Sequence, residues 1–401
     1  MRHTASLTAC AVAAAMLFAA ACSGDDPADP GAQGAPATSD ASPPPPPATS
    51  PAELPPDTAP PPDTAASDVL AAPLRAELPW GNFTLAARIA DKLDSGARLN
   101  FVLSLTETAD SDPAQAFEHG WLRAGADAQS RYGVETNPRI VGPFEPDADA
   151  QADTIAALIA SGDIDCLAVD AADPRRFETV IDLAIEAGVP TFTVGRDTPG
   201  SHRFGFFGVD GFAAGESAGR SVGEWAAADG ILIRRAGLLS GHAADPMSFE
   251  LMRGFVAGLS GIHSGVEWAN DPATVESHGF DEFFVYDSIE AWVLANSDVD
   301  IVFHTDEGLT QAAQVIADQL LYGDMYAVGF HLDSKVVAAI EDWTVAAALS
   351  PMRAESSYQA GTACADFLLD GRFETGMTAV EATVVTRANL GEADWSAPER
   401  R

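Results

Sequence analysis

From Leu99 onward, short runs of β-branched and aromatic residues alternate with longer, alanine-rich stretches of helical period. This alternation is typical of βαβ units on a parallel sheet. The runs predicted as strands are 99–105, 139–142, 166–169 and 191–194 in a first series, and 236–239, 266–268, 301–303 and 326–330 in a second. The long helix predicted after the first strand spans residues 113–132. The chain is therefore predicted to build one α/β architecture twice, as two doubly wound parallel-sheet lobes joined by a hinge.

The N-terminus, residues 1–21, predicts an export signal. Arg2 supplies its positive charge, and the apolar run at 7–21 is too short for a permanent membrane span. Small residues then precede Cys22, which resembles the lipobox of bacterial lipoproteins, and we expect Cys22 to carry a lipid anchor. Cys10 follows a leucine at the usual spacing but comes too early for a complete apolar region. The alternative is ordinary signal-peptidase cleavage with Cys22 unmodified.

Residues 22–67 are rich in Pro, Ala, Asp, Thr and Ser, and include five consecutive prolines at 43–47. Such a segment cannot bury apolar surface and is stiffened towards polyproline II. We interpret it as a spacer between the anchor and the folded part. An N-terminal extension at 68–98 is expected to contain a helix, because Leu85, Ile89 and Leu93 recur at helical spacing. Residues 391–401 are expected to form a tail.

Charge and motifs exclude several classes of function. The chain has 22 Lys plus Arg against 59 Asp plus Glu, a net charge of -37 that repels nucleic acid. Motifs of serine hydrolases, metalloproteases, P-loop enzymes and dinucleotide-binding enzymes are absent from the sequence, so we expect no catalysis and no cofactor. The eight histidines are scattered rather than spaced as metal ligands. Cys166 and Cys364 are expected to be separate buried thiols, with a disulfide left open.

Five segments together resemble a known family, the sugar-binding proteins of bacterial ABC transporters that include ribose-binding protein. They are 190–196, 207–210, 252–255, 298–307 and 328–330, and the resemblance covers about residues 99–390. It implies the type I periplasmic-binding fold. We assign 99–210 plus about 332–348 to the N-terminal lobe and 211–331 plus about 349–390 to the C-terminal lobe.

In that fold, ligands bind beyond the carboxyl ends of parallel strands, so residues at strand ends are the candidates for ligand binding. These are Thr106, Glu107, Phe117, Arg196, Asp197, Asp210, Leu251, Phe280, Asp306, His331 and Ser350. The resemblance implies that Arg196 donates hydrogen bonds to a sugar, and a salt bridge to Asp197 or a neighbour is the alternative. Phe117 and Phe280 would sandwich the apolar face of a ring. Asp306, where the family has asparagine, would accept from hydroxyl or amine donors.

Three positions depart from the family: His331 replaces an acid or amide, Leu251 an arginine and Ser350 a glutamine. Fewer charge-assisted contacts remain for a polyhydroxylated ligand. Either another sugar or polyol binds, or a less polar ligand such as a nucleoside, aromatic compound or lipid does.

The predicted function is capture of a small carbohydrate-like ligand between the lobes and its delivery to an ABC permease. The protein is expected to be a monomer anchored outside the cytoplasm, in the periplasm or on the cell surface. A ligand sensor for a membrane kinase or chemoreceptor is the alternative. Transcription regulators of the same fold are excluded, because the signal peptide and spacer occupy the place of a DNA-binding segment.

Overall fold

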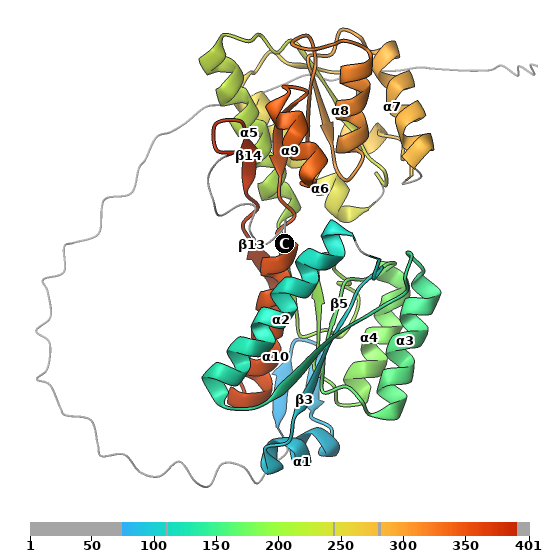
Figure 1. Cartoon of the computed structure of the whole chain (residues 1–401), viewed down its shortest axis with the longest axis vertical. Coiled ribbons are helices and arrows are strands. Elements are labelled where there is room, and N and C mark those ends of the chain that lie inside the picture. Colours follow the sequence, from blue (N-terminus) through green and yellow to red (C-terminus); the bar gives the residue numbers. More distant parts are fainter. Residues whose placement is uncertain (1–73, 110, 244, 280–281, 391–401) are drawn as a thin grey trace, which may run out of the picture. The chain divides into compact units, whose positions relative to one another are not determined.

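The structure is a computed structural model that describes residues 74–109, 111–243, 245–279 and 282–390. The described residues lie in one compact unit, and their strands form two six-stranded sheets and one hairpin. The two predicted α/β lobes are therefore confirmed (Figure 1). The predicted signal peptide, Cys22, the spacer and the tail lie outside the described residues. Across the described ranges, no helix has the length and apolar character needed to cross a membrane.

The first lobe contains a sheet of order β13-β7-β6-β5-β3-β4 in which every neighbouring pair is parallel. Its strands are β3 (Leu99–Ser104), β4 (Thr136–Val141), β5 (Cys166–Val169), β6 (Thr191–Val194), β7 (Gly205–Val209) and β13 (Gly376–Val380). Its helices are α1 (Ala87–Ser95), α2 (Asp112–Tyr132), α3 (Ala148–Ser161), α4 (Pro174–Glu186) and α10 (Arg353–Asp370). Helices cover the sheet, so the central strands β5 and β6 are buried along their whole length. The strand predictions at 166–169 and 191–194 are confirmed without change.

The second lobe has the sheet order β14-β12-β11-β10-β8-β9, parallel except for the β12–β14 pair. Its strands are β8 (Arg235–Leu239), β9 (Glu267–Trp268), β10 (Ile301–His304), β11 (Tyr326–Gly329), β12 (Val345–Leu349) and β14 (Val384–Thr386). Its helices are α5 (Gly211–Asp229), α6 (Pro246–Ile262), the short 3-10 helix η1 (Pro272–Thr274), α7 (Glu282–Ala295), α8 (Leu309–Asp318) and α9 (Ser334–Glu341). All four strands predicted in the second series overlap strands of this sheet.

The lobe membership of the C-terminal third differs from the sequence-based assignment. Residues 332–348 contain α9 and most of β12, and β12 pairs with β11 in the second sheet, not the first. Helix α10 instead packs beside α2 in the first lobe, and β13 extends the first sheet along β7 (Figure 1). Only β14 returns to the second sheet, so the chain crosses between the lobes after β7, after β12 and after β13. These pairings join segments far apart in sequence, which local periodicity does not report.

The helix expected in the N-terminal extension is present as α1, which contains Ile89 and Leu93, but two strands that were not predicted precede it. A hairpin of β1 (Arg75–Leu78) and β2 (Gly81–Thr84) precedes the short helix α1. Alternate residues of the hairpin, Ala76, Leu78 and Phe83, are buried. This period of two identifies strands, whereas the spacing used in the prediction begins only at Leu85.

A disulfide joins Cys166 on β5 to Cys364 on α10, with 5.9 Å between the Cα atoms. The expectation of two separate thiols is therefore wrong. Both cysteines are fully buried, but in one shared core, because α10 packs on the first lobe although it follows the second lobe's strands. The crosslink ties the return segment of the chain to the centre of the first sheet.

Helices α5 and α6 pack closely because glycines on each face the backbone of the other. A Cβ on Gly215 would lie 2.1 Å from the carbonyl oxygen of Leu251, and one on Gly254 would lie 2.1 Å from that of Phe212. Such distances are far below van der Waals contact, so a side chain at either position would force the helices apart.

We expect Gly254→Ala to lower the free energy of unfolding by about 1–3 kcal/mol, the usual cost of overpacking. Alanine has the higher helix propensity, so any loss must come from the helix contact. Gly261→Ala is the matched control, because it lies in the same helix and a Cβ there would meet no atom within 4 Å. Urea unfolding measures both variants, and equal stabilities would contradict the packing argument.

Candidate functional site

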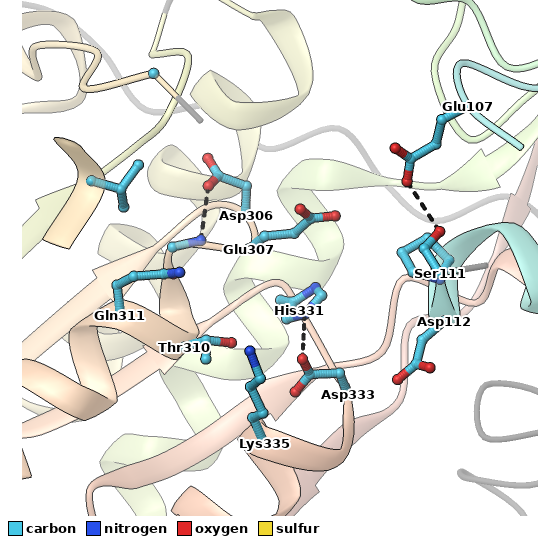
Figure 2. Close-up of a pocket in the computed structure, with 14 residues that line it drawn as sticks. Glu107, Ser111, Asp112, Asp306, Glu307, Thr310, Gln311, His331, Asp333 and Lys335 are labelled. Atoms are coloured by element: carbon cyan, nitrogen blue, oxygen red, sulfur yellow. Dashed lines mark hydrogen bonds and ion pairs between the residues drawn. The ribbon is translucent and has the colours of Figure 1, made fainter. Parts of the chain in front are cut away.

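A cavity of about 320 Å³, named here the strand-end pocket, lies at the carboxyl ends of β3, β10 and β11. Its lining residues are Glu107, Ser111, Asp112 and Pro113 from the first lobe, and Gly279, Val285, Asp306, Glu307, Gly308, Thr310, Gln311, His331, Asp333 and Lys335 from the second. Figure 2 shows their polar ends gathered from several loops and helix starts. The volume is at the small end of the range of about 300–1,000 Å³ for ligand pockets, which suits one small molecule.

Asp306 is the most heavily hydrogen-bonded acid in the strand-end pocket. One carboxylate oxygen accepts from Gly241 N at 2.8 Å and from Thr305 Oγ1 at 3.1 Å, and the other accepts from Gly308 N at 3.2 Å. Burial alone would raise the pKa of Asp306, but His304 and the two backbone N–H groups outweigh it and lower that pKa. The side chain is therefore an ionised acceptor held in a fixed position.

Behind Asp306 lies a pair of histidines that sequence reasoning did not single out. His278 Nε2 and His304 Nε2 are 2.9 Å apart, so one ring donates the hydrogen bond and the other accepts it. His304 is fully buried, and burial lowers its pKa from 6.5 to about 4. Burial also lowers the pKa of His278. The two residues are 26 positions apart, His278 in a loop and His304 at the end of β10, so no spacing in the sequence indicated the contact.

The buried imidazole predicts a loss of stability in acid. The unfolded chain protonates His304 below about pH 6.5, whereas the folded protein resists protonation until about pH 4, so the unfolded state binds more protons between these values. Stability due to this group is complete above that window and falls as the pH drops through it. We expect the free energy of unfolding to be about 2–3 kcal/mol lower at about pH 4.5 than at neutral pH from this residue.

Urea titrations across this window test the prediction with two variants. His304→Gln removes the titrating group and should flatten the dependence, while His119→Gln, an exposed position on α2, should leave it unchanged. An identical pH dependence in wild type and His304→Gln would contradict the assignment.

His331 lines the strand-end pocket beside Asp333 (Figure 2). Its Nε2 lies 3.4 Å from Asp333 Oδ2, and Asp333 Oδ1 accepts from Val336 N at 2.7 Å, capping α9. Burial opposes ionisation of Asp333, but His331 and the helix N–H groups lower its pKa overall. Among the described residues, His331 Nδ1 has no hydrogen-bond partner, although the side chain is only 6% exposed.

On the first-lobe side, Glu107 accepts from the Ser111 hydroxyl at 3.0 Å (Figure 2). Ser111 in turn accepts from Ala114 N at 3.4 Å and caps α2. The glutamate is therefore held at the entrance of a helix N-terminus, where the helix dipole favours negative charge.

Of the eleven residues predicted from strand ends, Glu107, Asp306 and His331 line the strand-end pocket. The lining residues that were missed, such as Asp112, Thr310 and Lys335, lie in the first turns of the helices that follow those strands. Listing the first helical turn after each strand, as well as the strand end, would have found them.

Arg196 and Asp197 lie at the end of β6 and make contacts within the first lobe. Arg196 Nε is 3.3 Å from Asp170 Oδ1, and Asp170 is the main cause of the raised pKa of Arg196. Weaker effects on that pKa come from Asp245 and Glu307. The alternative to ligand binding was a salt bridge of Arg196 to Asp197 or a neighbour; Arg196 pairs with Asp170, and Asp197 pairs with Arg203.

Several of the other predicted positions have a structural role in their own lobe. Asp210 caps α5 through Ala213 N, Leu251 is fully buried on α6, and Phe117 is buried in the first-lobe core. Ser350 is buried and accepts from Met352 N, and Thr106 is half-buried. Phe280 lies outside the described residues. Roles in ligand binding for all of these stay predictions.

No group of three or more His, Cys, Asp or Glu side chains within the described ranges could hold a metal ion. The strand-end pocket is instead a polar cavity, lined by acids that accept hydrogen bonds from backbone N–H groups and by one buried histidine. It lies at the carboxyl ends of parallel strands, the place where open α/β sheets bind their ligands.

The sequence profile of the periplasmic binding protein domain matches residues 106–372, more than half of the 401-residue chain. The chain belongs to the periplasmic binding protein family. This is a family of binding proteins rather than enzymes, and its name places its members outside the cytoplasm. A search of curated proteins finds no match for this periplasmic binding protein.

Solved structures support the fold. GanP, a glucose-galactose binding protein from Geobacillus stearothermophilus, matches with a TM-score of 0.61 and 20% identity over 73% of this chain and 99% of its own. An ABC transporter solute-binding protein from Burkholderia graminis, in complex with D-arabinose, matches with a TM-score of 0.62 and 16% identity over 74% of this chain and 97% of its own. A chain of the XylFII-LytSN complex matches with a TM-score of 0.59 and 17% identity over 73% of this chain and 98% of its own. At these identities the likeness concerns the fold of the periplasmic binding protein alone.

Proposed function

We propose that this protein is an extracytoplasmic receptor that captures one small hydroxylated ligand, a sugar or polyol, and delivers it to an ABC importer. The observation that carries the proposal is the strand-end pocket, whose polar lining comes from both lobes. Hydroxyl groups suit fixed acceptors such as Asp306 and donors such as Gln311 and Lys335. Structures of similar fold include binding proteins for glucose and galactose and one with D-arabinose bound.

The ligand is captured because residues of both lobes contact it and the two lobes are connected by segments of the same chain. A ligand that touches Glu107 and Asp112 on one side and Asp306 and His331 on the other binds best when both sets reach it together. It therefore shifts the population towards the state in which the lobes are closed on it. A permease that recognises this state distinguishes loaded from empty receptor.

A sensory role is the second candidate, because a protein of similar fold, XylFII, forms a complex with LytSN. The same ligand-bound state would then be presented to a membrane partner other than a permease. An apolar ligand is less favoured, since Pro113 and Val285 are the apolar side chains of the described lining.

We also propose that Cys22 carries the lipid anchor and that residues 22–67 act as its spacer. The support is the signal-like N-terminus and the proline-rich composition that follows it. Mass spectrometry of the protein isolated from membranes tests the anchor, because an unmodified Cys22, or a chain cleaved after it, would contradict it.

A thermal-shift screen of the purified full-length chain tests the receptor function. Arabinose, glucose, galactose and allose are titrated, and a ligand that binds only the folded state must raise the melting temperature. Trimethylamine N-oxide is the control, because an excluded osmolyte stabilises without saturating. We also propose that Arg196 donates to the ligand, so Arg196→Ala should reduce the shift. No saturable shift with any sugar or polyol would contradict the proposed function.

A further inference from the structure

The polar lining of the strand-end pocket is dominated by hydrogen-bond acceptors. Five of the lining residues are acids, Glu107, Asp112, Asp306, Glu307 and Asp333. Within the described lining, Lys335 is the one lysine or arginine. Ionised carboxylates only accept hydrogen bonds. A ligand for this pocket must therefore bring more donors than acceptors.

His331 supports the same conclusion independently of the acids. Its Nε2 faces the acceptor-only carboxylate of Asp333 at 3.4 Å, which in the neutral ring favours the tautomer with the proton on Nε2. Nδ1 is then an acceptor, and it is the buried atom for which the described residues provide no partner. An unsatisfied buried polar atom is costly, so a ligand donor placed at Nδ1 relieves that cost.

Glu107 from the first lobe and Glu307 from the second have no counter-ion in the described lining of the strand-end pocket, and Figure 2 shows their carboxylates pointing toward each other. In the part of the chain that the structure describes, neither Glu107 nor Glu307 makes an ion pair within 4.0 Å, and the one hydrogen bond of the Glu107 side chain is accepted from the neutral Ser111. Arg196 is near enough to Glu307 to have its pKa affected by it, but within 4.0 Å its Nε pairs with Asp170 and not with Glu307. A cationic group between the two glutamates would be attracted by both, and at short range such attraction is only partly screened by salt.

We propose that the ligand of the strand-end pocket carries a protonated amino group on a hydroxylated frame, as an amino sugar does. Glu107 and Glu307 hold the ammonium from opposite lobes, and Asp306 and His331 accept from the remaining donors. An ammonium has three donors and no acceptor, which matches this lining better than a hydroxyl does. The proposal rests on the proposed function, because it names the ligand class of the same pocket.

The overall acidity of the chain offers a competing explanation that the experiment must exclude. With 59 acidic residues, carboxylates occur over the whole surface and attract any cation weakly. Glu224→Gln is therefore the matched control for Glu107→Gln and Glu307→Gln. It removes the same charge from the same net total at an exposed position on α5 outside the pocket.

Isothermal titration of the full-length chain at neutral pH and physiological salt compares D-glucosamine and D-galactosamine with their N-acetyl derivatives and with glucose and galactose. We expect at least one amino sugar to bind about tenfold or more tightly than its uncharged counterparts. Glu107→Gln and Glu307→Gln should each weaken that amino sugar about tenfold while changing neutral-sugar affinity about twofold or less. Glu224→Gln should change neither.

The remaining outcomes separate this proposal from the proposed function. Equal or tighter binding of the neutral sugars, or equal effects of all three glutamine variants, overturns the cationic ligand and leaves the sugar receptor standing. Binding of a linear diamine such as putrescine, with no sugar of either kind bound, overturns both the amino-sugar ligand and the sugar receptor, because the diamine has no hydroxylated frame. Failure of every probe to bind overturns both.

Discussion

Replacing Asp306 with alanine is expected to weaken binding of the captured ligand by about 100-fold or more, measured by isothermal titration on the full-length chain. The residue is an ionised acceptor in the strand-end pocket, and charge-assisted hydrogen bonds in a sheltered site are among the strongest that proteins make. The same carboxylate also holds Gly241 N and Gly308 N, so its loss leaves both loops without their acceptor. The effect on affinity therefore combines a lost ligand contact with a less ordered pocket.

A control variant at a helix-capping aspartate outside the pocket shows whether the loss of affinity in Asp306→Ala comes from general destabilisation. Asp173 accepts from the backbone N–H groups of Arg175 and Arg176 at the start of α4 and does not line the pocket. Asp173→Ala should cost about 1 kcal/mol of stability, like other lost helix caps, and leave ligand affinity unchanged. Comparable losses of affinity in the two variants, or an Asp306→Ala protein that binds normally, would remove Asp306 from the site.

Removing the disulfide with Cys166→Ala and Cys364→Ala together is expected to lower the free energy of unfolding by about 3–5 kcal/mol. The crosslink closes a loop of 198 residues, and a loop of that length strongly restricts the unfolded chain. It also holds α10 on the first sheet after the chain has passed through the whole second lobe. The bond should therefore secure the segment that sequence reasoning had assigned to the wrong lobe.

Urea unfolding of wild type with and without a reductant provides the comparison, since reduction removes the bond without altering side-chain volume. The reduced wild type and the double variant should unfold at similar urea concentrations, both well below the oxidised wild type. Ligand affinity should hold in the folded double variant, because neither cysteine lines the strand-end pocket. Identical unfolding of oxidised and reduced wild type would contradict a stabilising role.

The strands were the most predictable part of the structure. β5 and β6 are short, wholly apolar or β-branched runs, and both were predicted to the residue because burial on both faces leaves a continuous local pattern. The hairpin β1–β2 was missed for the opposite reason. Its alternating buried residues are few, and the helical spacing on which the prediction rested begins only after the hairpin, at Leu85.

Only part of the site was predictable, and there is a physical reason why some residues were found and others were not. Glu107, Asp306 and His331 were found because parallel strands end at one edge of a sheet, so a position in the chain implies a position in space. The contact between His278 and His304 was not found, because it joins a loop outside the strand pattern to a strand end. Which acid meets which donor depends on loop conformation, which periodicity does not encode.

The sequence by itself determined that this chain forms two parallel α/β lobes with acidic and polar residues at their strand ends. That follows because strand and helix identity depends on the local spacing of apolar side chains. Only the tertiary structure decided that α10 and β13 return to the first lobe, that Cys166 and Cys364 are bonded, and that His331 Nδ1 is buried without a partner. Each depends on packing between segments distant in sequence, where the free energy of burial selects among arrangements that look alike locally.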